Sequence, residues 1–439
     1  MGLSSEESGR LVSEMQANLD STAVAPPAAD VPSAEPQGAI FRLRNSVQNY
    51  DWGSPTEIPQ VLGQAPDGQP VAELWLGGHP SAPSVVEKPD GGSIKLDELI
   101  RTYPEQMLGE RVLNRFGPVL PYLAKLLSAE KALSLQVHPK SHAARAGFNR
   151  ENRNRVPIDA FHRSFHDAQH KPEMIVALTK FEALAGLRAP RAALKAIAGF
   201  TAPLFTALRK DLEADRQSGS LHRTITSLFS NRSAPNRPDL VADALAEVRA
   251  KVQAGTGDLS DETVLKLADQ FGDDVGIFAP YLLNHITLQP GESLFLEAGE
   301  IHAYISGLGV EIMANSDNVL RAGLTSKYVN TEALLECMSF DAVPISRPKQ
   351  YMLGSKSRGD VYRAPVREFG LTLYDIVPAE PLPLPVSGPK IVLNLDGELT
   401  LAHNGGAVTL QQGESVFVPH QLGAVEISGD GHAFAAWVP

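Results

Sequence analysis

The hydrophobic periodicity of this chain changes twice along its length, and these changes constrain the fold more than any other feature. From about residue 41 to 187, short runs with alternating apolar residues are broken by Gly, Pro, Asn and Asp, which is typical of antiparallel strands. From about residue 190 to 278, apolar residues such as Leu204 and Leu208 recur at helical spacing. After Tyr281 the strand pattern resumes and continues to the C-terminus. The pattern therefore predicts two β units with a helical segment between them.

A short internal repeat favours a common architecture for the two β units. Residues 291–296 read GESLFL and residues 413–418 read GESVFV, and each stretch follows a strand-like run and a turn. Gly-Glu-Ser is also a common turn sequence, so coincidence remains an equal alternative on this match alone.

Length and charge restrict the class of protein. A chain of 439 residues is too long for one ordinary core and predicts two or three packed units. The formal net charge is −12, which disfavours nucleic acid as a partner, and no apolar run is long enough to span a bilayer. A single cysteine, Cys337, and an N-terminus without a signal-peptide pattern favour the cytoplasm. We expect residues 1–40, rich in Ala, Pro and Ser, to be a disordered extension.

The stretch Leu133–Pro139 places three polar side chains on one face of a predicted strand. Ser134, Gln136 and His138 alternate with apolar residues that would form the opposite face. Polar groups that project into a barrel interior are costly unless they bind something. The alternative is that this face contacts solvent.

Two further stretches have the same character. In HKPEM, Lys171 and Glu173 lie on one side of a strand that Pro172 begins or places at an edge. In EIHAY, His302 and Tyr304 share a face at i and i+2. Taken alone, each of these groups is as easily explained by a solvated surface.

Combined, the stretches supply a set of metal ligands. Gln136, His138, Glu173 and His302 offer oxygen and imidazole nitrogen atoms, which suit Zn²⁺ bound by three or four protein groups with an open position. With only one cysteine in the chain, a Cys-rich structural zinc site is excluded. A metal held in this way would be catalytic.

Several segments, in order along the chain, resemble one enzyme family, the type I mannose-6-phosphate isomerases. The resemblance covers nearly the whole chain from about Phe41. The matching segments are NYDWGS at 49–54, AELWLG at 72–77, LSLQVHPK at 133–140, HKPEM at 170–174 and GEIHAYISGLGVEIMANSDNVLRAGLTSKYV from Gly299.

This resemblance implies a mainly β fold with a cupin-like, jelly-roll barrel, an inserted helical domain and a second cupin-like domain. It implies one Zn²⁺ per chain, bound by the four residues named above. On the repeat pairing, Ala424 aligns with His302, so we expect no metal site in the second β unit. The implied layout is a catalytic domain at 41–189 and 281–345, a helical domain at 190–280 and a C-terminal domain at 346–439.

The implied reaction interconverts mannose 6-phosphate and fructose 6-phosphate through a cis-enediol, in carbohydrate metabolism and GDP-mannose precursor synthesis. Lys171, Glu311 and Asp317 are rival candidates for the base, and the sequence does not choose among them. Arg321 would stabilise enediolate or phosphate charge. The remaining candidates for substrate contact are Ser134 and Lys327 at the phosphate, Tyr304, and His170, which would assist ring opening or support the metal site. The expected partner is a small sugar phosphate, with no nucleic acid and no membrane, and the expected state is a monomer or weak homodimer.

Two other readings remain open. A metal-dependent cupin oxygenase would favour iron and several histidines, whereas Gln136, Lys171 and Arg321 suit a phosphorylated sugar. A non-catalytic sugar-binding cupin would predict loss of the ligand set, yet all four ligands are present.

Overall fold

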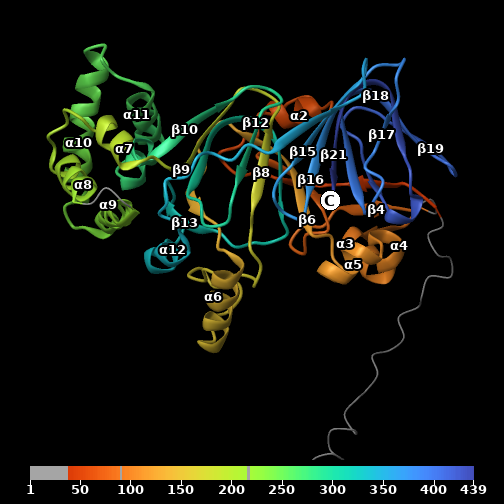
Figure 1. Cartoon of the computed structure of the whole chain (residues 1–439), viewed down its shortest axis with the longest axis horizontal. Coiled ribbons are helices and arrows are strands. Elements are labelled where there is room, and N and C mark those ends of the chain that lie inside the picture. The colour runs from red at the N-terminus through yellow and green to blue at the C-terminus, as the bar shows by residue number, and fades with distance from the viewer. Residues whose placement is uncertain (1–37, 89–90, 215–217) are drawn as a thin grey trace, which may run out of the picture. The chain divides into compact units, whose positions relative to one another are not determined.

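The computed structural model describes residues 38–88, 91–214 and 218–439, in which Ile40–Pro439 form one compact unit (Figure 1). The extension predicted at residues 1–40 lies almost entirely outside the described residues. Two antiparallel sheets of ten and eleven strands carry the fold, as the strand pattern predicts. In the described ranges, no helix is long and apolar enough to cross a membrane.

The ten-stranded sheet, called the site sheet below, is organised around one long strand, β12. Its first half pairs with β7 and β9, and its second half pairs with β6 and β8. The strands of the site sheet are β2 Ser46–Gln48, β3 Glu73–Gly77, β6 Tyr122–Ala129, β7 Leu135–Val137, β8 Glu173–Ala177, β9 Phe181–Leu187, β10 Leu283–Leu288, β11 Ser293–Leu296, β12 His302–Ala314 and β13 Leu320–Gly323.

The eleven-stranded sheet, called the C-terminal sheet below, contains three strands from the beginning of the chain. Its strands are β1 Phe41–Arg44, β4 Val85–Glu87, β5 Ser93–Lys95, β14 Lys349–Leu353, β15 Arg358–Arg363, β16 Gly370–Ile376, β17 Leu382–Pro383, β18 Lys390–His403, β19 Gly406–Leu410, β20 Ser415–Val418 and β21 Glu426–Trp437. β1 pairs with β20, where Phe41 lies opposite Phe417. The layout expected from the sequence placed all of 41–189 in the first β unit. It differs here because a strand pattern specifies a strand but not its distant partner.

Helices form where the periodicity predicts them between residues 190 and 278, but they also form in segments where only strands were expected. The segment between the two β units contains α7 Pro190–Ala196, α8 Pro203–Glu213, α9 Ser218–Ser230, η1 Asn231–Ser233, α10 Arg237–Gln253, α11 Leu259–Phe271 and η2 Val275–Tyr281. Outside it lie α2 Glu57–Val61, α3 Leu96–Thr102, α4 Pro104–Leu108, α5 Glu110–Phe116, α6 Ser141–Arg153, α12 Thr331–Cys337 and η3 His420–Leu422. α11 begins with a capping box, in which the side chains of Asp258 and Asp261 each accept a backbone N–H of the other residue.

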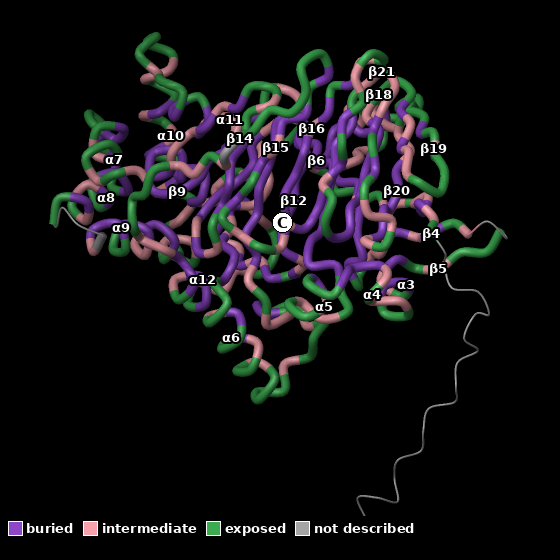
Figure 2. The backbone as a smooth tube through the Cα atoms, turned by 45° about the vertical axis from the view of Figure 1, so that its right-hand side comes forward, coloured by how far each residue is buried: buried purple, intermediate pink, exposed green. Residues whose placement is uncertain are grey.

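The helical segment covers the outward face of β7. Figure 1 shows its green helices beyond β9 and β10. Leu135 and Val137 are fully buried in one core with Leu204, Leu208 and other helical residues. Burying a Leu or Val side chain stabilises a fold by about 1.5–3 kcal/mol. The alternation along β7 then turns Gln136 to the opposite side. In Figure 2 the strands are largely buried, while the outer helical turns are exposed.

The internal repeat has the same local geometry in both sheets. The Glu292 carboxylate accepts the backbone N–H of Gln289 at 2.9 Å, and the Glu414 carboxylate accepts that of Gln411 at 2.8 Å. Each turn has a glycine with φ near +80°, at Gly291 and Gly413, and each leads into a fully buried strand. The two stretches therefore share one turn-and-strand geometry.

Candidate active site

Strand register places three predicted site residues in one row. Gln136 on β7 lies opposite His302 on β12 and also opposite Arg321 on β13. Residues directly opposite each other in adjacent strands project to the same face. The outward face of β7 packs against the helical segment, so this row of side chains lies on the inward face of the site sheet.

A cluster of three buried side chains adjoins this row. Atoms of His138, Glu173 and His302 that could bind a metal all lie within 4.8 Å of one another. The Nδ1 atom of His138 is 2.7 Å from the carbonyl of Asn318, and that of His302 is 3.0 Å from the carbonyl of Glu300. A carbonyl only accepts, so each Nδ1 carries the hydrogen and each Nε2 has its lone pair free.

The free lone pairs converge on a carboxylate. The Oε2 atom of Glu173 lies 3.1 Å from Nε2 of His138 and 3.4 Å from Nε2 of His302. Nε2 of His138 and Oε2 of Glu173 have no hydrogen-bond partner among the described residues, although both are buried. Burial lowers the pKa of His138 to about 4, so the ring is neutral at pH 7. Acceptors that face one another in this way are stable when a cation lies between them.

The donor set fits zinc. Two imidazole nitrogens and a carboxylate oxygen are a common catalytic zinc set, and the nearby Gln136 amide can add a fourth oxygen. The Gln136 amide nitrogen lies 3.3 Å from Nε2 of His302, so the side chain belongs to the same cluster, and a 180° turn of the amide would present its oxygen to a metal. Within the described ranges, no other group of three His, Cys, Asp or Glu side chains meets the same condition.

A second row crosses β3, β6 and β12, where Trp75, Lys125 and Glu311 lie opposite one another. The Lys125 ammonium is 3.2 Å from Glu73 and 3.1 Å from Glu311, and it lies 5.2 Å from the centre of the Trp75 ring. The Trp75 indole N–H donates to Glu73 at 2.7 Å. Sequence reasoning named Glu311 but missed Lys125 and Glu73. One sequence feature could have identified Lys125, because it lies inside the apolar run of 120–129. A buried strand tolerates a lysine only where other groups compensate its charge.

Burial sets the proton affinities in this row. It raises the pKa of Glu311, and the neighbouring carboxylates of Glu173 and Glu73 add to the effect while Lys125 opposes it. Burial alone would lower the pKa of Lys125, but Glu73 and Glu311 raise it above its usual value. Lys125 therefore stays charged, while Glu311 is a carboxyl whose pKa is moved towards neutrality, as proton transfer requires.

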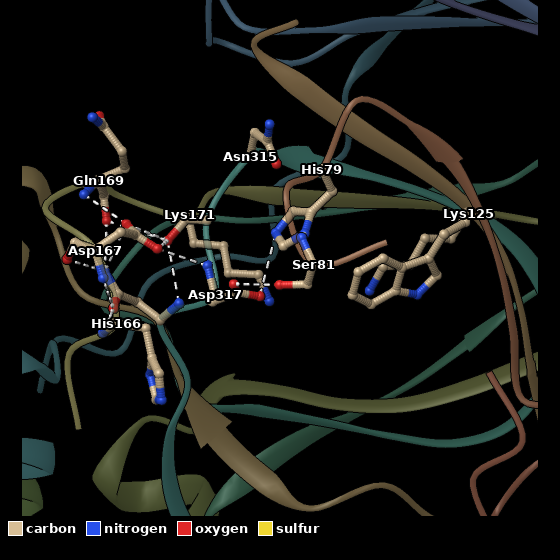
Figure 3. Close-up of polar contacts among 12 residues, drawn as sticks. His79, Ser81, Lys125, His166, Asp167, Gln169, Lys171, Asn315 and Asp317 are labelled. Atoms are coloured by element: carbon tan, nitrogen blue, oxygen red, sulfur yellow. Dashed lines mark hydrogen bonds and ion pairs between the residues drawn. The ribbon is translucent and has the colours of Figure 1, made fainter. Parts of the chain in front are cut away.

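A hydrogen-bond network holds Asp317 at the rim of the site (Figure 3). The backbone N–H of Ser81 donates to Nδ1 of His79, so Nε2–H of His79 faces Asp317 at 3.3 Å. On the other side, the Asp167 carboxylate accepts the backbone N–H of Asp317 at 2.8 Å. Asp167 also accepts from the Asn318 side chain at 3.1 Å. The same Asn318 holds the His138 ring, so one network supports both the rim and a metal-ligand candidate. His79 and Asp167 were not identified from sequence, because no local pattern marks them.

These groups adjoin one cavity of about 860 Å³, whose lining includes Gln136 and Glu173 but not the rings of His138 and His302. The predicted residues that line it are Ser134, Gln136, Lys171, Glu173, Tyr304, Glu311, Asp317, Arg321 and Lys327. The hydroxyl of Tyr304 is buried without a hydrogen-bond partner among the described residues. No ion pair of Arg321 or Lys327 with a described carboxylate is present. Burial lowers the pKa of Lys327, and the charge of Arg321 lowers it further. Two unpaired cations on one wall can hold an anion.

His170 does not line this cavity, in contrast to the other candidates for substrate contact. Its Nε2 lies 2.8 Å from Glu368, on the loop between β15 and β16 of the C-terminal sheet. Its neighbour Lys171 points inward, with its ammonium 2.8 Å from Glu173. An ammonium that donates to a carboxylate has no lone pair with which to accept a proton.

The arrangement combines a metal-binding cluster, a carboxyl with raised pKa and an anion-binding wall. Together these can bind a small anionic substrate, polarise its oxygens and move a proton between neighbouring atoms.

Known proteins match this chain over most of its length. Residues 40–190 match the family described as phosphomannose isomerase type I, catalytic domain, and residues 376–437 match mannose-6-phosphate isomerase, cupin domain. The chain is 35% identical to mannose-6-phosphate isomerase of Escherichia coli K12 over 394 residues, covering 89% of this chain and 97% of the relative. It is 33% identical to mannose-6-phosphate isomerase 1 of Arabidopsis thaliana over 405 residues, covering 87% and 89%.

Solved structures agree. A zinc-bound mannose 6-phosphate isomerase superposes with a TM-score of 0.80 at 33% identity, covering 91% of this chain and 99% of that chain. A mutant of phosphomannose isomerase from Salmonella typhimurium gives the same TM-score, identity and coverage. The overall architecture is therefore of the cupin type, with helices and antiparallel sheets.

Proposed function

This chain belongs to the type I phosphomannose isomerase family, and from that premise we propose how its residues interconvert mannose 6-phosphate and fructose 6-phosphate. The observation that carries the proposal is the convergence of buried, unpartnered His138 and Glu173 atoms beside a cavity with two unpaired cations, Arg321 and Lys327. A cupin oxygenase or a non-catalytic sugar-binding cupin explains neither the family membership nor this combination.

Gln136, His138, Glu173 and His302 hold the zinc ion. Zinc in this position supplies a Lewis acid that polarises the oxygens of the open-chain sugar. The chain's own contribution is orientation. The carbonyls of Asn318 and Glu300 fix both rings, so that their Nε2 atoms face the metal position.

Arg321 and Lys327 anchor the phosphate, with Ser134 as a further donor. All three line the cavity, and no ion pair of either cation with a described carboxylate is present. A phosphate offers the oxygens that a guanidinium binds in a fork. With the phosphate held on this wall, C1 and C2 at the other end of the open-chain sugar extend towards the buried groups.

Glu311 is the base. As a carboxylate it takes the proton from C2 of open-chain mannose 6-phosphate, and the C–H electrons form the C1–C2 double bond of the cis-enediolate. The proton of O2 passes to O1, and the carboxyl returns its proton to C1, which leaves the C2 carbonyl of fructose 6-phosphate. Lys125, at 3.1 Å, keeps the carboxylate charged between turnovers. Lys171 is bound to Glu173 and Asp317 lies at the rim, so both serve substrate orientation and charge balance.

We further propose that each sheet forms a jelly-roll barrel, with the helical domain at 190–280 inserted into the first. The catalytic domain takes 41–189 and 281–345, apart from β1, β4 and β5, which complete the C-terminal domain at 346–439. We propose a cytoplasmic monomer or weak homodimer for this arrangement.

The test is a coupled assay for fructose 6-phosphate formed from mannose 6-phosphate, on chelated protein with and without added Zn²⁺. Activity is expected to return with zinc in the wild type. In Glu173→Ala, both activity and stoichiometric zinc binding are expected to be lost, because only two imidazoles and an amide remain.

His285→Ala is the matched control. Its Nε2 is also buried without a partner, but His285 lies on β10 outside the ligand cluster. Full activity in this variant and none in Glu173→Ala supports the site. Zinc-loaded wild type that does not turn over mannose 6-phosphate would refute the proposed reaction.

A further inference from the structure

One ion pair connects the two sheets next to the active site. His170 precedes Lys171 in the segment that leads into β8, and its Nε2–H donates to Glu368 at 2.8 Å. The partners are 198 positions apart in the chain. Glu368 comes from the C-terminal sheet, which carries no metal-ligand cluster among its described residues.

The Glu368 carboxylate is held ready for this contact. Its Oε2 accepts the backbone N–H of Arg367 at 3.0 Å, which leaves Oε1 for His170. Its side chain is 17% exposed and that of His170 is 30% exposed, so the pair is partly shielded from solvent. Burial alone would raise the pKa of Glu368, but the hydrogen bond and charge of His170 hold it below the usual value.

The backbone is anchored on the N-terminal side of His170, where the Gln169 carbonyl accepts from the Asn318 side chain at 3.0 Å. No backbone hydrogen bond of His170 or Lys171 to another described residue is present. Pro172, which follows Lys171, has no N–H to donate. Its carbonyl accepts the backbone N–H of Ala314 at 3.1 Å. The Glu368 contact therefore anchors the residue that precedes Lys171, whose own side chain is held by Glu173.

Lys171 depends on this anchor for its position. Its side chain lines the cavity and reaches Glu173 at 2.8 Å. A displacement of about 1 Å at a group that orients substrate can lower turnover by about a hundredfold. Movement of residues 170–171 would therefore change the position of Lys171 relative to the reacting atoms and lower turnover.

We infer that Glu368 is a positioning residue, which acts through His170 to hold Lys171 at the cavity and makes the C-terminal sheet part of the catalytic apparatus. The inference rests on the proposed isomerase function. It assigns the second β unit a role beyond stability.

A double-mutant cycle on zinc-loaded protein tests the inference. Glu368→Ala is expected to lower kcat by about tenfold, with unchanged zinc content and a small change in melting temperature. Glu368→Gln keeps an oxygen that accepts from the imidazole and is expected to recover part of the loss. In a His170→Ala background, Glu368→Ala is expected to add no further loss, because both changes break one contact.

Asp396→Ala is the matched control, since Asp396 pairs with His432 at 2.9 Å in the same sheet but away from the cavity. It is expected to leave kcat unchanged. Wild-type kcat in Glu368→Ala, or losses that multiply in the double variant, would overturn the inference.

Hydrogen exchange separates this inference from the proposed function. The peptide covering 166–171 contains hydrogen-bonded amides at His166 and Gln169, and it is expected to exchange faster in Glu368→Ala but not in Asp396→Ala. Unchanged exchange overturns the inference even if the enzyme acts on another sugar. Faster exchange supports it independently of substrate.

Discussion

Replacing Lys125 by methionine is expected to destabilise the protein by about 4 kcal/mol. Lys125, Glu73 and Glu311 are only 6%, 6% and 3% exposed, and the ammonium lies 3.1–3.2 Å from both carboxylates. Breaking a buried ion pair costs about 3–5 kcal/mol, because the remaining charge has no partner. Protonation of Glu311, whose pKa burial already raises, limits the cost to one uncompensated charge.

The expected change in melting temperature follows from the size of the unit. An unfolding entropy of about 2.1 cal/mol/K per residue over Ile40–Pro439 gives about 0.8 kcal/mol/K. A loss of about 4 kcal/mol therefore lowers the melting temperature by about 5 °C. Differential scanning fluorimetry of zinc-loaded wild type and Lys125→Met at pH 7.5 measures this shift.

Two further variants decide the cause. Adding Glu311→Gln to Lys125→Met removes one buried charge, and Glu73 retains its Trp75 N–H, so about half of the loss should return. Lys180→Met breaks an exposed pair with Glu182 of similar length and is expected to give no measurable shift. If Lys125→Met melts within about 1 °C of wild type, or if the second substitution lowers the temperature further, the attraction does not hold these carboxylates in place.

Two other predictions concern Lys390 and Tyr304. Burial lowers the pKa of Lys390 to about 8, so the unfolded chain binds its proton more tightly, and stability should rise by about 3 kcal/mol as pH increases from about 8 to 10.5. Lys390→Met should raise the melting temperature at pH 7.5 and remove this rise, and an equal gap from wild type at pH 7.5 and 10 would contradict the reasoning. Tyr304→Phe should lower kcat/KM by about tenfold or more with little change in melting temperature, since the buried hydroxyl lies beside the Glu311 carboxyl but makes no hydrogen bond of good geometry among the described residues. Wild-type kinetics would show that Tyr304 only packs among the strands of the site sheet.

The predictable part of the site is the part encoded locally. His302 and Tyr304 share a face because they are two residues apart. The strand pattern alone also places Gln136 on the other face of its strand from the apolar Leu135 and Val137. The helical segment was predictable for the same reason, since its period is visible in any short window. Strand membership was not, because β1 pairs with β20 across almost the whole chain.

The groups that sequence missed act through distant partners. Lys125 is a lysine in an apolar run until Glu73 and Glu311 lie beside it, and Glu368 is an ordinary loop carboxylate until His170 faces it. Neither contact has a spacing that could be read from the chain. The run around Lys125 at least raises the question of where its charge is compensated, whereas Glu368 offers no such signal.

Charge distribution explains how an acidic protein can select an anionic substrate. The whole chain carries a formal net charge of −12, which repels anions at long range. Inside the cavity the cations Lys125 and Lys171 are already bound to carboxylates, so their fields are largely spent on the protein. No such pairing is present for Arg321 and Lys327 among the described residues, and at physiological salt their attraction is screened beyond about 8 Å. Selectivity for a small phosphorylated sugar over a polyanion then follows, because Lys327 is exposed but Arg321 is half-buried in the cavity wall, so only a ligand small enough to enter the cavity contacts both.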